Sequence, residues 1–298
     1  MNIKKSKLNS PIRWAGSKKR LLNDMLSLFV PEKENYVEPF LGSGIVLINV
    51  LDNNAQLRYK NFYVNDINKN IISLYNMLKN DFEYLISEVN KLFDLYNDSS
   101  FKSKENMYYR IRAEFNETFD ERLKTVYFFF LMKSGFNGVY RENKKGNFNV
   151  PFGKKDFLTL DCTNLRRISE LIQNVIFYNL EFEEFMFKLK EQGILNNAFV
   201  YCDPPYLPDD DSINKKQELY TSISFDHVGF VDTINSFKLF SFMISMSDSK
   251  MSESIYVEHG KLQKRNISSI LRIINPKRKF ESKEIIFTNY DIYDNEDY

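Results

Sequence analysis

The chain has 298 residues, of which 43% are hydrophobic and 27% are charged, a composition typical of a globular protein that buries a core. Its formal net charge of +1 excludes a uniformly basic protein. Its two cysteines exclude a disulfide framework, and its two histidines leave little scope for a zinc site. The N-terminus has no signal-peptide pattern, and the longest apolar run, residues 125–132, is too short to span a bilayer, so we expect a cytoplasmic protein.

Basic residues gather in four segments, at residues 2–20, 140–155, 261–265 and 272–283. Any one charged segment is usually a solvated face. Several that converge on one cleft would suit a nucleic-acid partner, because lysine and arginine displace counterions from phosphates. Both interpretations stay open at this point.

Strand and helix patterns alternate at both ends of the chain and are interrupted in the middle. The alternating segments, in chain order, are 35–40, 43–51, 61–66 and 69–79, and later 175–180, 183–193, 197–203, 225–237, 239–247 and 283–293. Between them lie three helical patterns, at 81–97, 103–119 and 121–134, and an irregular segment that runs to residue 153. The alternation predicts one doubly wound α/β sheet, and the block 79–155 is expected to be a helical insert.

A glycine-containing corner follows the first predicted strand, in "VEPFLGSG". Gly42 and Gly44 allow the backbone to turn tightly and to approach a ligand closely. Asp66 ends the second predicted strand, where an acid can hold the hydroxyls of a ribose. Because the third glycine of the dinucleotide pattern is missing, an adenosine-bearing ligand without a pyrophosphate fits better than NAD. S-adenosylmethionine is such a ligand.

The segment "VYCDPPY" runs from an apolar strand into an acidic and aromatic corner. Pro204 and Pro205 end the strand near Asp203 and remove two backbone donors. Asp-Pro pairs mark surface turns in many proteins, so this corner alone leaves a structural and a functional interpretation equally open.

Taken together, the motifs resemble those of the Dam-type DNA adenine-N6 methyltransferases, the alpha class of amino-methyltransferases. "RWAGSKKRLL", "VEPFLGSG", "VNDINKNIISLYN", the helical block and "VYCDPPY" follow one another in the order of that family, and "SGFNGVYRENKKGNFNVPFG" and "EIIFTNYD" are similar as well. The resemblance implies a Rossmann-like methyltransferase domain, residues 1–78 and 156–298, and a helical target-recognition subdomain, residues 79–155. It implies S-adenosylmethionine as cofactor and double-stranded DNA as partner.

The resemblance assigns catalysis to the corner formed by Asp203, Pro204, Pro205 and Tyr206. The amine of adenine is a poor nucleophile, and acceptors aimed at its two hydrogens favour its attack on a methyl group. The Asp203 carboxylate and the Pro204 carbonyl suit that role, and Tyr206 offers a face on which adenine stacks. The base must leave the duplex to reach this corner. No metal is needed.

The resemblance also assigns the binding residues. Those expected at the cofactor are Trp14, Lys18, Phe40, Gly42, Gly44, Asp66, Ile67 and Glu181. Those expected at DNA are Arg13, Phe136, Asn137, Val139, Arg141 and Lys154. Structural alternatives remain for three of these residues. Trp14 could be a core aromatic, Phe136 could cap the helical block, and Arg141 could pair with an acid of that block.

Several finer points stay open. GATC is the favoured target, a cytosine-N4 methyltransferase and an inactive DNA-binding regulator are the alternatives, and a partner restriction endonuclease is a further possibility. We expect a monomer in solution. Two departures from the family pattern are Ser17, where glycine is usual, and the acidic run Asp209–Asp211.

Overall fold

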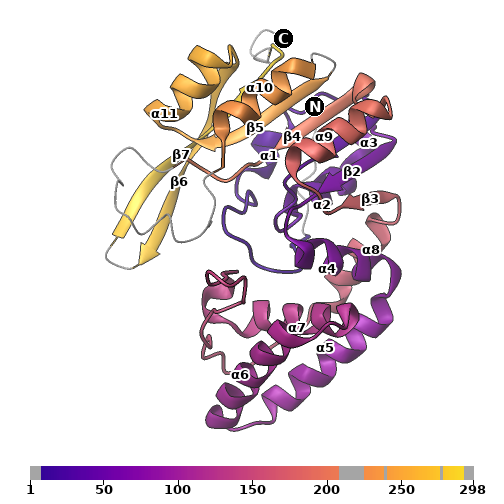
Figure 1. The fold of residues 1–298 in the computed structure, drawn as a ribbon, viewed down its shortest axis with the longest axis vertical. Helices are drawn as coiled ribbons and strands as arrows, with labels where there is room; N and C mark the ends of the chain where they lie inside the picture. Colours follow the sequence, from indigo (N-terminus) through magenta and orange to yellow (C-terminus); the bar gives the residue numbers. More distant parts are fainter. Residues whose placement is uncertain (1–7, 208–224, 238–239, 276–277, 292–298) are drawn as a thin grey trace.

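The computed structural model describes residues 8–207, 225–237, 240–275 and 278–291, with the backbone alone for residues 268–275 and 278–283. Its seven strands form one sheet in the order β3-β2-β1-β4-β5-β7-β6 (Figure 1). The first five strands are parallel, and β7 runs antiparallel between β5 and β6. The strands are β1 (Asn35–Glu38), β2 (Asn61–Asn65), β3 (Val175–Tyr178), β4 (Ala198–Cys202), β5 (Ser241–Ser247), β6 (Gln263–Asn275) and β7 (Arg278–Thr288).

Helices cover both faces of the sheet, which is why its central strands are buried along their whole length. Every residue of β1 and β4 is buried. The neighbours Tyr36 and Val37 belong to two different core clusters, one on each face. The helices that pack on the Tyr36 face are α1 (Leu22–Leu26), α2 (Ile45–Asp52), α3 (Asn54–Leu57), α4 (Lys69–Asn80) and α8 (Cys162–Leu171). Those on the Val37 face are α9 (Phe182–Glu191), α10 (His227–Phe237) and the π-helix Ser254–His259, which follows α11 (Lys250–Glu253).

The strand order reverses between β1 and β4. From β1 the chain winds outward to β2 and β3, and it then returns to place β4 on the other side of β1. Ligands of doubly wound sheets bind beyond the carboxyl ends of the strands at such a point. The predicted glycine corner, Asp66 and Asp203 follow β1, β2 and β4 directly. The topology therefore brings the predicted site segments to one edge of the sheet.

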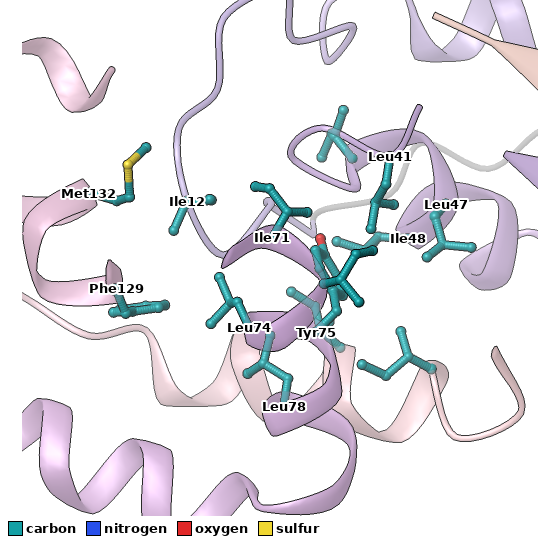
Figure 2. Packing of buried hydrophobic residues seen from close by; sticks show 14 of the residues in the cluster. Ile12, Leu41, Leu47, Ile48, Ile71, Leu74, Tyr75, Leu78, Phe129 and Met132 are labelled. Atoms are coloured by element: carbon teal, nitrogen blue, oxygen red, sulfur yellow. The ribbon is translucent and has the colours of Figure 1, made fainter. Parts of the chain in front are cut away.

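Three further helices form a block at one end of the molecule (Figure 1). They are α5 (Phe82–Asn97), α6 (Phe101–Glu117) and α7 (Glu121–Ser134). Helix α4 joins this block to the sheet, because its apolar residues lie between α2 on one side and α7 on the other. Figure 2 shows Ile71 and Tyr75 of α4 in this packing, with Phe129 of α7 and Ile48 of α2 on either side. One continuous core therefore holds the block on the sheet.

The segment after α7 folds back on the helical block. Phe136 N–H donates to the Pro151 carbonyl, and an antiparallel bridge pairs Glu142 with Phe148. Asn116 of α6 holds the main chain of Phe148 through two hydrogen bonds. The segment between residues 135 and 153 is therefore a looped hairpin anchored on α6 and α7.

The predicted mixed α/β fold is confirmed, but some elements were missed. Helix α8 and strand β6 were not predicted, and Ser103–Phe119 was expected where α6 spans Phe101–Glu117. The run Asp209–Asp211 lies outside the described residues. In the part of the chain that the structure describes, no helix is long and apolar enough to cross a membrane.

Candidate active site

The acidic corner lies at the carboxyl end of β4, beside the reversal of strand order. Asp203 follows the last buried residue of the strand, and its side chain is 22% exposed. Pro204 is buried, Pro205 is exposed and Tyr206 is half-buried. The corner therefore presents one partly accessible carboxylate at the end of an otherwise buried strand.

The ammonium of Lys18 binds this carboxylate. Its Nζ lies 2.7 Å from each carboxylate oxygen of Asp203, and it donates to the Gly16 carbonyl at 2.8 Å. The same atom lies 4.7 Å from the centre of the Tyr206 ring. Because Lys18 is only 2% exposed, this is a buried, charge-assisted pair that fixes the carboxylate and the aromatic ring together.

Side chains from β4, β5 and β7 support the corner through hydrogen bonds to Asp203 and Tyr206. The hydroxyl of Tyr206 donates to Glu284 Oε2 at 2.6 Å, and Glu284 is only 3% exposed. Ser245 Oγ lies 3.5 Å from Asp203 Oδ1, and Tyr201 OH lies 2.6 Å from Ser245 Oγ. Since a carboxylate only accepts, Ser245 donates to Asp203, and Tyr201 in turn donates to Ser245. None of these three supporting residues was predicted, because nothing in the local sequence of their strands indicates a contact with this corner.

The glycine corner after β1 is tightly packed. Gly44 has φ +71°, and a Cβ atom there would overlap the hydroxyl of Tyr75. That hydroxyl donates to the Ser43 carbonyl at 2.6 Å. Gly42 also has a positive φ, and its N–H donates to Asp66 Oδ2 at 2.8 Å. The two glycines therefore have a conformational and a steric reason to be glycine.

Asp66 joins the corner after β2 to the glycine corner. Its other oxygen, Oδ1, accepts from the Asn68 N–H at 2.8 Å. Asn179 donates to the main-chain carbonyls of Asp66 and Ile67 at 2.8 and 2.9 Å. The side chain of Ile67 is 64% exposed, which leaves an apolar surface beside a fixed carboxylate.

An aromatic pair borders the same region. Phe40 stacks on Phe182, with ring centroids 5.4 Å apart and planes at 11°. Phe182 was not predicted, and its signal in the sequence is an aromatic residue at the first position of a helix that follows a strand. Glu181 immediately precedes this helix and is exposed.

One short N-terminal segment touches both corners. Trp14 lies against the glycine corner, because a Cβ atom on Gly42 would be 3.2 Å from Trp14 Cδ1. Four residues later, Lys18 binds Asp203. Ser17, which departs from the family pattern, is exposed between them. The N-terminal segment therefore contacts both the glycine corner at Gly42 and the acidic corner at Asp203.

The residues predicted at DNA lie on and beside the looped hairpin. Phe136 and Asn137 are exposed, and Asn137 has a positive φ of 53°. The side chain of Arg13, which is exposed, lies against Gly138, where a Cβ atom would be 3.1 Å from its Cδ. This contact brings a residue of the N-terminal segment to the hairpin.

The remaining DNA candidates lie further along the hairpin. Arg141 donates to Asn149 Oδ1 through Nε at 2.7 Å and to the Asn149 carbonyl through Nη2 at 3.2 Å, so it pairs with an amide of its own hairpin rather than with an acid. Val139 is half-buried and Lys154 is exposed. The structure thus places all six candidates on or next to one segment.

Comparison with known proteins decides the class of the protein. Residues 14–272 match the family model described as D12 class N6 adenine-specific DNA methyltransferase. The chain belongs to this family. The family acts on N6 of adenine, which favours adenine over cytosine as the target base. The match covers the helical block and strands β1 to β5, and it ends within β6.

Individual relatives agree with this assignment. The methyltransferase is 34% identical to the type II methyltransferase M.MjaIII of Methanocaldococcus jannaschii over 224 residues, 72% of this chain and 73% of that protein. It is 33% identical to the DNA adenine methylase of Escherichia coli strain K12 over 197 residues, 66% of this chain and 64% of that protein. Among solved structures, it matches a precorrin-6y C5,15-methyltransferase from Geobacter metallireducens with a TM-score of 0.39 and 8% identity over 93% of each chain. That last likeness adds nothing to the family assignment.

Acidic side chains dominate the buried edge of the methyltransferase site. Glu38 is only 1% exposed and accepts a hydrogen bond from Tyr36 OH at 2.7 Å. Burial raises the pKa of the Glu38 carboxyl well above its usual value, and the charges of Asp203 and Asp66 add to this, while the Tyr36 hydrogen bond opposes it. Among the described lysines and arginines, Lys18 alone is buried. The buried side of the site therefore combines several carboxyl groups with one ammonium group.

The charge of Lys18 is expected to set the pH at which the methyltransferase loses activity. Burial raises the pKa of the Asp203 carboxyl, and Lys18 opposes that rise. If Asp203 acts as an ionised acceptor for the amine of the base, the rate is expected to fall as the pH falls through this pKa. In Lys18→Gln the opposing charge is gone, so the pKa of Asp203 rises further. The low-pH side of the pH–rate profile, its acid limb, therefore moves to higher pH. Single-turnover rates measured against pH check this, with Lys19→Gln as the control because Lys19 is exposed. An unmoved acid limb in Lys18→Gln would contradict it.

Proposed function

We propose that this methyltransferase transfers the methyl group of S-adenosylmethionine to N6 of an adenine flipped out of duplex DNA. The observation that supports this most is the N-terminal segment that contacts both corners of the site. Trp14 packs on the glycine corner at Gly42, and Lys18 binds Asp203. A cofactor seated by the first corner and a base seated at the second would then be neighbours.

Asp203 and Pro204 act on the amine of the base. The Asp203 carboxylate and the Pro204 carbonyl accept its two hydrogens, which favours the tetrahedral geometry that the amine needs in order to attack. S-adenosylmethionine, when bound, supplies an electrophilic methyl group on a positively charged sulfur. Pro205 stiffens the corner, so the acceptors are in place before the base arrives. Asp203 is also the nearest acceptor for the proton that the amine releases after methylation.

Lys18 and Tyr206 prepare the corner for a base. Without a base, the Lys18 ammonium occupies both oxygens of Asp203 and keeps the partly buried carboxylate charged. The adenine amine competes with this ammonium for the carboxylate. The Tyr206 ring, held by Glu284 through its hydroxyl, offers the face on which the base stacks.

The cofactor is held by the two corners and the surfaces between them. Asp66 takes the ribose hydroxyls, and Ile67 packs on the adenine ring of the cofactor. Phe40 lies at the same end, supported by Phe182. The other residues proposed around the cofactor are Trp14, Lys18, Gly42, Gly44 and Glu181.

DNA is held by the looped hairpin, and GATC is the target we propose. Phe136 and Asn137 enter the gap left by the flipped base, where an aromatic ring replaces lost stacking. Arg141 reads a guanine through two hydrogen bonds, for which its fork geometry is suited. Arg13 and Lys154 contact phosphate or a flanking base. Action as a monomer, and any pairing with a restriction endonuclease, stay predictions from the sequence.

Tritium transfer tests the proposed function. The protein is incubated with S-adenosylmethionine labelled in its methyl group and with matched duplexes that contain GATC or GTAC, and the DNA is digested to nucleosides. The proposal predicts label in N6-methyladenine from the GATC duplex alone. Equal labelling of both duplexes would overturn the target, and label only in N4-methylcytosine, or none at all, would overturn the reaction.

A further inference from the structure

Trp14 and Tyr140 join two parts of the site that are distant in the sequence. Their rings stack with centroids 5.6 Å apart and planes at 25°. Trp14 belongs to the N-terminal segment at the cofactor corners. Tyr140 belongs to the looped hairpin, between the DNA candidates Val139 and Arg141. This stack is therefore a direct contact between the proposed cofactor site and the proposed DNA-reading segment.

A first path of contacts leads from this stack to Asp66. The indole of Trp14 lies against Gly42, where there is no room for a side chain larger than hydrogen without displacing the ring. The N–H of Gly42 donates to Asp66 Oδ2 at 2.8 Å. A ribose hydroxyl that binds Asp66 therefore acts on a carboxylate that already holds the backbone under Trp14.

A second path leads from the other oxygen of Asp66 to the same tyrosine. Asp66 Oδ1 accepts from the Asn68 N–H at 2.8 Å, and Asn68 Oδ1 accepts from the Asn70 N–H at 3.0 Å. Asn70 Nδ2 then donates to the hydroxyl of Tyr140 at 3.0 Å. Both paths start at the Asp66 carboxylate and end at Tyr140, so together they form a closed ring of contacts.

Tyr140 is firmly seated on the helical block at the same time. Its ring lies 5.9 Å from Phe128 of α7 and 5.6 Å from Phe148 of the hairpin, and its hydroxyl donates to Glu142. Movement of Tyr140 therefore moves its neighbours Val139 and Arg141. When a ligand at Asp66 orders these contacts, the hairpin has less conformational entropy left to lose when it binds the second ligand.

We propose that Tyr140 is a positioning residue that couples cofactor binding at Asp66 to the placement of the DNA-reading residues beside it. The inference rests on the proposed function, because it requires an adenosine ligand at one end and duplex DNA at the other. Coupling between two sites is reciprocal, so the duplex must tighten cofactor binding by the same factor as the cofactor tightens duplex binding. Tyr140 touches neither reacting group and acts through Trp14 and the hairpin.

The test measures binding of S-adenosylhomocysteine, which cannot react, by calorimetry with and without a saturating GATC duplex. In the native chain the duplex is expected to tighten binding by about tenfold, within the usual range of such coupling. Tyr140→Leu removes the stack and the hydroxyl, and the factor is expected to fall below about twofold while each ligand still binds alone. Asn70→Ala cuts only the second path and is expected to lower the factor less, which keeps the test valid if Tyr140→Leu does not fold.

A matched control and a spectroscopic readout separate coupling from general damage. Tyr127→Leu also removes a half-buried tyrosine of the helical block, one whose hydroxyl donates to Glu114 outside the ring of contacts, and it should retain native coupling. Trp14 is the single tryptophan of the chain, so its fluorescence reports the stack directly and should change in Tyr140→Leu but not in Tyr127→Leu.

The outcomes are distinguishable. Native coupling in both Tyr140→Leu and Asn70→Ala, or no coupling in the native chain when both ligands bind, would overturn the inference and leave the proposed function intact. Failure of the native chain to bind either ligand would overturn the proposed function, and the inference would fall with it.

Discussion

Replacement of Asp203 with alanine is expected to lower the single-turnover rate of methyl transfer by about 10²–10³-fold, the usual cost of losing one preorganised electrostatic partner of the reacting group. The reason is that the adenine amine loses the acceptor that favours its attack. Binding of S-adenosylhomocysteine and of duplex DNA should change little, because the cofactor residues at Gly42 and Asp66 remain. The rate and the two binding constants are measured on the same preparation.

A second variant controls for the loss of the Lys18 ion pair, which Asp203→Ala also removes. Lys18→Met removes the same pair but leaves the acceptor in place. If the acceptor is what matters, Lys18→Met retains much more activity than Asp203→Ala at a pH where Asp203 is ionised. Equal loss in the two variants would mean that the pair, and not the acceptor, accounts for the effect.

Replacement of Gly44 with alanine is expected to destabilise the protein by about 2–4 kcal/mol. A left-handed φ costs a non-glycine residue roughly 1 kcal/mol, and overpacking a filled site adds about 1–3 kcal/mol. The added methyl group would overlap the hydroxyl of Tyr75, a fully buried residue of α4 (Figure 2). Urea unfolding measures the change in the free energy of unfolding, and cofactor binding should be lost with it.

Gly146 provides the matched control for this prediction. It has φ +77°, close to that of Gly44, but a Cβ atom there would meet nothing within 4 Å. Gly146→Ala therefore carries the conformational cost alone, about 1 kcal/mol. A similar loss of stability in both variants would show that Tyr75 yields to the methyl group and that the packing of the glycine corner is not tight.

The positions of Asp66 and Asp203 could be predicted because a general rule of sheet topology governs them. Each ends a parallel strand, and the carboxyl ends of such strands share one edge of the sheet. The role of Lys18 was only partly predicted. The resemblance placed it at the cofactor, but its contact with Asp203 joins residues 185 positions apart, and no local pattern encodes that distance.

Other features were missed for identifiable physical reasons. Glu284 directly follows Lys283 in β7, so the local sequence gives no sign that its carboxyl group is buried. It meets Tyr206 because β7 is inserted antiparallel beside β5. Strand β6 was not predicted, because its two ends were interpreted only as parts of the basic segments 261–265 and 272–283. Helix α8 had a readable signal, since Leu165 and Ile168 are buried at helical spacing after the N-cap residue Asp161.

The structure of a complex with S-adenosylhomocysteine and a GATC duplex is the most direct test of the proposed role of Asp203. The deciding quantity is the distance from the target N6 to the carboxylate oxygens of Asp203. We expect an adenine outside the helix, on the face of Tyr206, with N6 about 3 Å from that carboxylate and with Lys18 no longer bound to both oxygens. An adenine that stays stacked in the duplex, or a flipped base whose amine lies elsewhere while Lys18 keeps both oxygens of Asp203, would contradict it.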